Sequence, residues 1–198
     1  HLFLVHAHEA VVHPVVDEGA AVRPFGLRDL VRVMHGDVVD ATMMSCTALR
    51  QFFQEQVADA KKTGILLSLH LKATMMKVSD PIIFGHAVTV YFADLFDKYG
   101  NLFSELGVDP DNGVGDILAK TKTLSPEQKA AIEADFQACL QNGPPLAMVD
   151  SGRGITNLHV PSDVIVDASV AAALRIGGKM WGPDGGEYDT KAMIPDRC

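Results

Sequence analysis

The chain has 198 residues, of which 47% are hydrophobic and 21% charged, a balance typical of a globular chain with one substantial core. Its formal net charge of -8, without a dense cluster of Lys and Arg, argues against a nucleic-acid-binding surface. No apolar stretch approaches the roughly 18 to 20 residues that a membrane-spanning helix needs. We therefore expect neither a nucleic-acid partner nor a membrane partner.

The three cysteines, Cys46, Cys139 and Cys198, are odd in number and far apart, so they suggest neither a disulfide framework nor a CxxC metal site. We expect a reducing, cytoplasmic setting. The first residue is His rather than Met, and Cys198 follows Ile-Pro-Asp-Arg without a polar tail. This pattern suggests a piece excised from a longer protein.

Two regions differ in their local pattern. Residues 1–40 are rich in Val, Ala and His and are broken by Pro and Gly, which predicts a small β-rich or irregular segment. In residues 41–198 helical and strand patterns alternate, which predicts an α/β segment. Its first helix lies between the N-cap Ser45 and Gly64, because apolar residues recur there at a spacing of three to four. Residues 65–71 then alternate like a strand, with leucines on one face.

Further elements follow in the same alternating order. Asp80-Pro81 begins a helix that runs towards Gly100, and Ser125-Pro-Glu-Gln has the capping box of a helix that ends at Gly143. The later elements are two short buried strands and the start of another helix: residues 146–149, 164–166 and 170–174. The remaining stretch is Gly-rich.

Lys72 and Asp167 are candidates for chemistry because each follows a predicted buried strand. In open α/β folds the carboxyl ends of strands assemble sites from residues that are distant in sequence. A lysine can carry a proton, and a carboxylate can bind a hard divalent cation. Lys77 and Asp163 remain alternatives, although the alternating face and the strand-end position favour Lys72 and Asp167.

Two glycine-containing stretches resemble binding loops only in part. The stretch Ser151–Gly154 begins like a dinucleotide fingerprint, but Asn157 stands where the last glycine or alanine would be. Residues 109–116 hint at a calcium loop, but the glycine is one position early and no glutamate closes the loop. We expect a turn at both places. Among the histidines, His70 and His159 lie near the candidate residues and are expected to be structural, with a supporting role at the site as the alternative.

Three long motifs carry a resemblance to a known family: LHLKATMMK at 69–77, GITNLHVPSDVIVDAS at 154–169 and GKMWGPDG at 178–185. Together they resemble the monomeric type of NADP-dependent isocitrate dehydrogenase, and the likeness runs from about Gly36 to Cys198. The resemblance implies an α/β fold with a mixed sheet and flanking helices, as in a segment of the large domain of the isocitrate and isopropylmalate dehydrogenases.

The resemblance also implies a reaction: oxidative decarboxylation of isocitrate to 2-oxoglutarate and CO2 in the tricarboxylic acid cycle, with NADP and Mg²⁺ or Mn²⁺. It implies that Lys72 is a catalytic, substrate-binding residue and that Asp167 is a metal ligand. The family's enzymes are several times longer, and their other substrate, metal and NADP contacts lie outside this stretch. We therefore expect a monomeric parent enzyme and an isolated piece that is inactive and prone to self-association. The alternative is a stand-alone small-ligand or metal-binding α/β module without redox activity.

Overall fold

The computed structural model describes the backbone of residues 3–5 and the whole of residues 44–195. Apart from these three positions, the expected β-rich or irregular segment of residues 1–40 lies outside the described residues. Except for the start of its first helix, every element discussed below belongs to one compact unit, residues 1–7 and 49–198. No helix in the described ranges is long and apolar enough to cross a membrane.

Four strands form the main sheet: β1 (Phe3–Val5), β2 (Leu66–Leu69), β5 (Lys179–Trp181) and β6 (Glu187–Met193). β6 runs parallel to β1 and β2 and antiparallel to β5. The sheet is therefore mixed, and the predicted α/β class is confirmed. A separate two-stranded sheet is formed by β3 (Met148–Asp150) and β4 (Ile155–Thr156).

β2 lies at the centre of this architecture, because chain segments pair with both of its edges. One edge pairs with β6, and the other forms two isolated parallel bridges, Leu67 with Leu146 and Leu71 with Ile165. Between the two bridges, the Leu69 N–H donates to the side-chain oxygen of buried Asn157. A side chain thus completes the edge where no strand is present, and every residue of β2 is buried.

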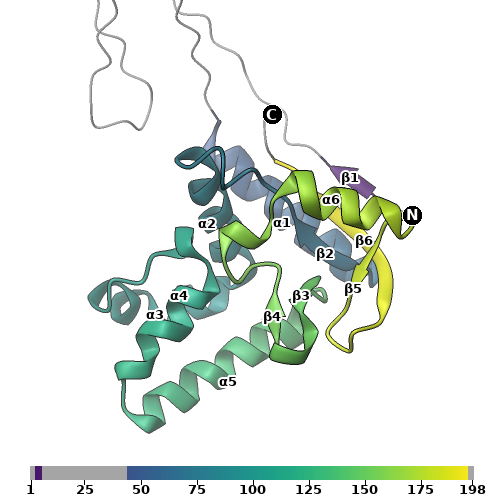
Figure 1. The fold of residues 1–198 in the computed structure, drawn as a ribbon. Helices are drawn as coiled ribbons and strands as arrows, with labels where there is room; N and C mark the ends of the chain where they lie inside the picture. The colour runs from purple at the N-terminus through teal and green to yellow at the C-terminus, as the bar shows by residue number, and fades with distance from the viewer. Residues whose placement is uncertain (1–2, 6–43, 196–198) are drawn as a thin grey trace, which may run out of the picture. The chain divides into compact units, whose positions relative to one another are not determined.

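Two helices cover opposite faces of the sheet, α1 (Cys46–Thr63) and α6 (Val166–Arg175) (Figure 1). Leu66 packs in a buried cluster with Ala173 of α6. The next residue of β2, Leu67, pairs with Lys191 of β6, and Lys191 forms an ion pair with Asp59 of α1. Because successive strand residues point to opposite faces, α6 and α1 lie on opposite sides.

The remaining helices lie beyond the sheet and contain the aromatic core: α2 (Ser79–Tyr91), α3 (Ala93–Glu105), α4 (Val114–Lys120) and α5 (Pro126–Asn142). Short 3-10 turns are Pro110–Asn112, Thr121–Thr123, Ser151–Arg153 and Pro161–Asp163. The predicted capping box at the start of α5 is present, with Ser125 accepting from Gln128 and the Gln128 side chain accepting from Ser125. Phe92 is fully buried and stacks on Phe136 of α5, with ring centroids 5.2 Å apart.

Several element boundaries differ from the predictions. The single helix expected from residue 80 to residue 100 is two helices that meet at Phe92, whose backbone leaves the helical region. The strand expected at 164–166 is reduced to the bridge at Ile165, because α6 already begins at Val166. Likewise, β3 begins at Met148 rather than at 146. Helix α4 and the hairpin of β5 and β6 were not predicted.

Candidate active site

The structure brings Lys72 and Asp167 together. Leu71 and Ile165 pair in parallel, so the two chain segments leave the sheet at the same edge and in the same direction. The Lys72 Nζ lies 3.6 Å from an Asp167 carboxylate oxygen, an ion pair longer than an ordinary hydrogen bond. The two side chains are 25% and 53% exposed, so both remain accessible from solvent.

Asp80 holds the backbone of Lys72 through a hydrogen bond. This carboxylate lies in the first turn of α2, is 1% exposed and accepts the Lys72 N–H at 2.7 Å. Its other oxygen accepts the Ser79 hydroxyl at 2.9 Å. The Lys72 carbonyl in turn accepts the N–H groups of Met75 and Met76 at 2.8 and 2.7 Å. Sequence reasoning noticed Asp80 only as a helix start; its position next to the predicted strand end is the signal that could have revealed its contact with Lys72.

The first turn of α6 holds Asp167. The Val166 N–H donates to the Leu71 carbonyl at 2.7 Å, which joins this turn to the end of β2. Ser169 lies one half-turn further along, and its Oγ is 2.6 Å from Nδ1 of His70. His70 is fully buried, and burial lowers its pKa to about 4, so its imidazole is neutral near pH 7. The polar face predicted for this strand is thus enclosed beneath α6.

The two alternative residues lie elsewhere. Lys77 is exposed in the loop before α2. Asp163 is exposed at the end of a 3-10 helix, where its charge opposes the lowering of the His159 pKa that burial causes. The ion pair that joins the two strand-end segments is formed by Lys72 and Asp167 instead. Geometry therefore favours the same pair that the sequence pattern favoured.

Asp167 has the oxygen chemistry that Mg²⁺ or Mn²⁺ requires, and its side chain is 53% exposed. Across residues 44–195, however, no three His, Cys, Asp or Glu side chains are grouped so that they could hold a metal ion. The described residues fit one ligand of such a site. The other ligands must come from water, substrate or other residues.

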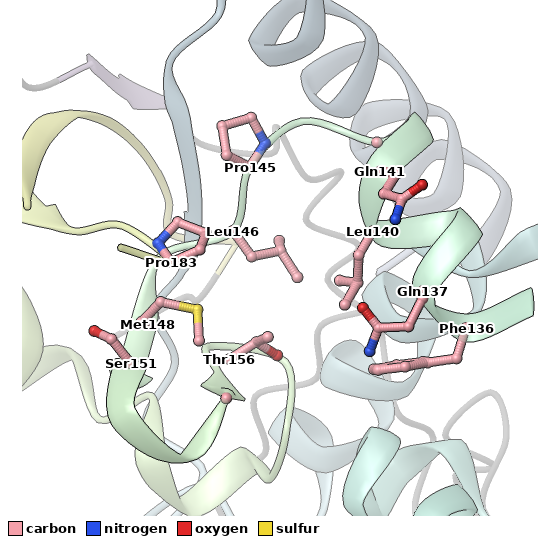
Figure 2. Close-up of a pocket in the computed structure, with 12 residues that line it drawn as sticks. Phe136, Gln137, Leu140, Gln141, Pro145, Leu146, Met148, Ser151, Thr156 and Pro183 are labelled. Atoms are coloured by element: carbon pink, nitrogen blue, oxygen red, sulfur yellow. The ribbon is translucent and has the colours of Figure 1, made fainter. Parts of the chain in front are cut away.

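A pocket of about 430 Å³ lies between α5 and the β3–β4 sheet, away from Lys72 and Asp167 (Figure 2). Its lining carries no charged side chain and consists of Phe136, Gln137, Leu140, Gln141, Gly143, Pro145, Leu146, Met148, Ser151, Gly154, Thr156 and Pro183. A tricarboxylate needs cationic partners. This pocket is therefore unsuited to isocitrate.

The stretch Ser151–Gly154 is a turn, as expected, whereas residues 109–116 form a turn only as far as Gly113, because α4 begins at Val114. Ser151–Arg153 is a 3-10 turn closed by the Asp150 carboxylate, and Gly154 follows in the left-handed region at φ +68°. Asn157, which breaks the fingerprint, is the residue that caps Leu69 in the sheet. In the other loop, the Asp109 carboxylate accepts the Asp111 N–H within a turn.

The sequence matches a known protein family over most of its length. The sequence model of the family described as monomeric isocitrate dehydrogenase matches residues 6–198. The chain belongs to this family. Over 171 residues it is 57% identical to isocitrate dehydrogenase [NADP] 2 of Colwellia maris, and over 172 residues it is 54% identical to isocitrate dehydrogenase [NADP] of Azotobacter vinelandii. A third relative, isocitrate dehydrogenase [NADP] of Corynebacterium glutamicum, is 54% identical over 170 residues.

These matches cover 86 to 87% of this chain but only 23% of each relative. The chain thus spans about a quarter of the length of the relatives it matches. The matched quarter includes both Lys72 and Asp167 within the family region.

Proposed function

We propose that the protein containing this segment is an NADP-dependent isocitrate dehydrogenase that oxidatively decarboxylates isocitrate to 2-oxoglutarate and CO2. The ion pair of Lys72 and Asp167 at the shared strand ends is the observation that carries the proposal. The names of the relatives support the reaction and its cofactor. We further propose that the mixed sheet is part of a large domain like that of the isocitrate and isopropylmalate dehydrogenases, and that the protein acts in the cytoplasm.

The reaction requires that the substrate hydroxyl lose its proton while hydride leaves to NADP, and that CO2 then depart to give an enolate. A bound Mg²⁺ or Mn²⁺ would polarise the hydroxyl oxygen and stabilise the negative charge that develops there. Asp167 would supply one oxygen ligand to this ion. Lys72 would donate hydrogen bonds from Nζ to substrate oxygens and carry a proton to or from the reacting group. We assign no residue of this segment to NADP.

The isolated segment should be inactive. One carboxylate and one ammonium group are too few to bind a divalent cation together with a tricarboxylate. The apolar pocket beside α5 would be a surface through which the isolated segment self-associates, whereas the intact protein would be a monomer. No observation favours a stand-alone binding module, since the site holds only part of a metal donor set.

The test is a pair of substitutions in the intact protein, Lys72→Met and Lys77→Met. Lys72→Met should lower kcat by about 10²- to 10⁴-fold, because a positioned proton carrier contributes that much, and should leave the NADP dissociation constant nearly unchanged. Lys77→Met is the matched control and should stay near wild type. Loss of activity in Lys77→Met with a normal Lys72→Met enzyme would transfer the role to Lys77.

The metal assignment has its own pair, Asp167→Asn and Asp163→Asn. Asp167→Asn should raise the Mg²⁺ concentration needed for half activity, because an amide is a weaker ligand than a carboxylate for a hard cation. Asp163→Asn should not. If the metal requirement were unchanged in Asp167→Asn, this segment would contribute no ligand of the kind proposed.

A further inference from the structure

The first turn of α6 lacks the side-chain hydrogen bond from an N-cap residue that usually stabilises the start of a helix. Its N-cap residue is Ile165, which has no side chain able to cap the helix. Asp167 is mostly held by its backbone, since its carboxylate touches Lys72 only at 3.6 Å. The side-chain bond that ties this turn to the sheet comes two residues later, where Ser169 meets His70.

The direction of each hydrogen bond in this contact can be assigned. The Ser169 hydroxyl donates to the Ile165 carbonyl at 2.7 Å, so its proton is already used. Its oxygen must therefore accept from Nδ1–H of His70, at 2.6 Å. Nε2 of the neutral ring then carries no proton and accepts from the Ser68 hydroxyl at 2.8 Å. The same hydroxyl also lies 3.1 Å from Met180 Sδ, but a thioether sulfur is a weaker acceptor than the ring nitrogen. The polar atoms of this imidazole are all satisfied in one tautomer.

We infer that His70, acting through Ser169, is a positioning residue that fixes the Asp167 carboxylate relative to Lys72. His70 is rigid because it is fully buried, directly follows β2 and donates its backbone N–H to the Met193 carbonyl at 2.9 Å. Asp167 lies between two hydrogen bonds that anchor its helix turn. In one, the Val166 N–H donates to the Leu71 carbonyl, and in the other the Ser169 hydroxyl oxygen accepts from His70 Nδ1. The inference rests on the proposed role of Asp167 as a metal ligand.

Outer groups that orient a metal ligand typically contribute 10- to 100-fold to metal affinity or activity. Asp167 is oriented indirectly, through the helix backbone, so the lower end applies here. Ser169→Ala leaves the imidazole N–H without its acceptor and releases the turn. We expect the dissociation constant for Mn²⁺ to rise about tenfold. Ser169→Thr keeps a hydroxyl at the same place and should stay within about threefold of wild type.

The experiment measures Mn²⁺ binding to the intact protein by the electron paramagnetic resonance of free Mn²⁺, with isocitrate present and without NADP, so no turnover occurs. Thr121→Val is the matched control, because the buried Thr121 hydroxyl also bonds the carbonyl four residues back, at 2.8 Å, but on α4. Weakened binding in Ser169→Ala, with Ser169→Thr and Thr121→Val near wild type, supports the inference.

Asp167→Asn separates a failure of the positioning role from a failure of the proposed metal-ligand role. If it weakens Mn²⁺ binding and Ser169→Ala does not, the positioning role is wrong while the proposed metal ligand stands. If neither variant changes Mn²⁺ binding, both are wrong. A second measurement does not depend on any variant folding: nitrogen-15 shifts of the histidine rings in the wild-type protein should show His70 with a proton on Nδ1 alone at pH 7. A proton on Nε2 would overturn the inference.

Discussion

Replacing Asp80 tests how firmly Lys72 is held. The buried Asp80 carboxylate accepts the Lys72 N–H at 2.7 Å, and a hydrogen bond to a charged group contributes about 1.5 to 3 kcal/mol. Asp80→Ala removes that acceptor, so local opening at Lys72 should become easier by this amount. At 1.4 kcal/mol for each factor of ten, the Lys72 amide should exchange its hydrogen about 10- to 150-fold faster. Asp80→Asn keeps one acceptor oxygen and should show a rise of about tenfold or less.

Hydrogen exchange of the intact protein, followed by mass spectrometry of peptides that cover residues 70–76, measures this effect. Asp184→Ala is a matched control, because the exposed Asp184 carboxylate also accepts a backbone N–H, that of Gly186, but in the hairpin of β5 and β6. It should change exchange only near residue 186. Unchanged exchange at Lys72 in Asp80→Ala, or an equal rise in Asp184→Ala, would show that Asp80 does not hold the lysine.

Four further substitutions test packing, titration and capping. Gly85→Ala should destabilise the protein by about 1 to 3 kcal/mol in urea unfolding, because its Cβ would lie 2.0 Å from the Asp111 carboxylate and 3.0 Å from the Asp111 backbone nitrogen. Gly100→Ala is the control: its Cβ meets open space in α3, so it should stabilise the protein by up to about 1 kcal/mol. The pKa of His70 is lowered to about 4 in the folded state, so the unfolded chain binds the proton at a higher pH than the folded chain does. The free energy of unfolding should therefore fall by about 3 kcal/mol as the pH drops from 6.5 to 4. Unfolding of His70→Gln, measured across the same pH range, should lack this fall. Ser125→Ala should cost about 1 kcal/mol and loosen the first turn of α5, visible as faster exchange there.

The meeting of Lys72 and Asp167 was predictable because it depends on one rule. Residues that follow parallel chain segments leave the sheet at the same edge, and Leu71 and Ile165 are paired in that way. The rule works even though the second predicted strand is only a bridge. The residues that hold the pair were harder to foresee. Ser169 acts through a contact with His70, which is distant in sequence, and Asp80, although near Lys72 in sequence, shows locally only the pattern of a helix start. Local patterns place such residues on a helix without showing what they face.

The missed elements have a similar cause. The helix break at Phe92 comes from a ring that packs on Phe136 of a distant helix, while the local sequence continues a helical pattern. β6 begins with three exposed residues and contains the charged Lys191, so its sequence does not alternate like a buried strand. The strand forms because β2 offers a parallel edge and because Asp59 of α1 pairs with the buried lysine. Tertiary pairing decided both cases.

At the candidate site, buried groups hold the backbone while the ends of the two side chains remain exposed. Behind Lys72 and Asp167 the backbone is fixed by two buried side chains: Asp80 of α2 accepts the Lys72 N–H, and His70, which directly follows β2, contacts Ser169 of α6. The side-chain ends remain 25% and 53% exposed. With these backbone anchors and the ion pair at 3.6 Å, the two groups that we propose to react would stay in register, and their exposed ends would remain available to a substrate and a cation. Because a hard cation takes about six oxygen ligands and Asp167, in the proposed role, would give one or two, further ligands would have to approach from the exposed side of this carboxylate.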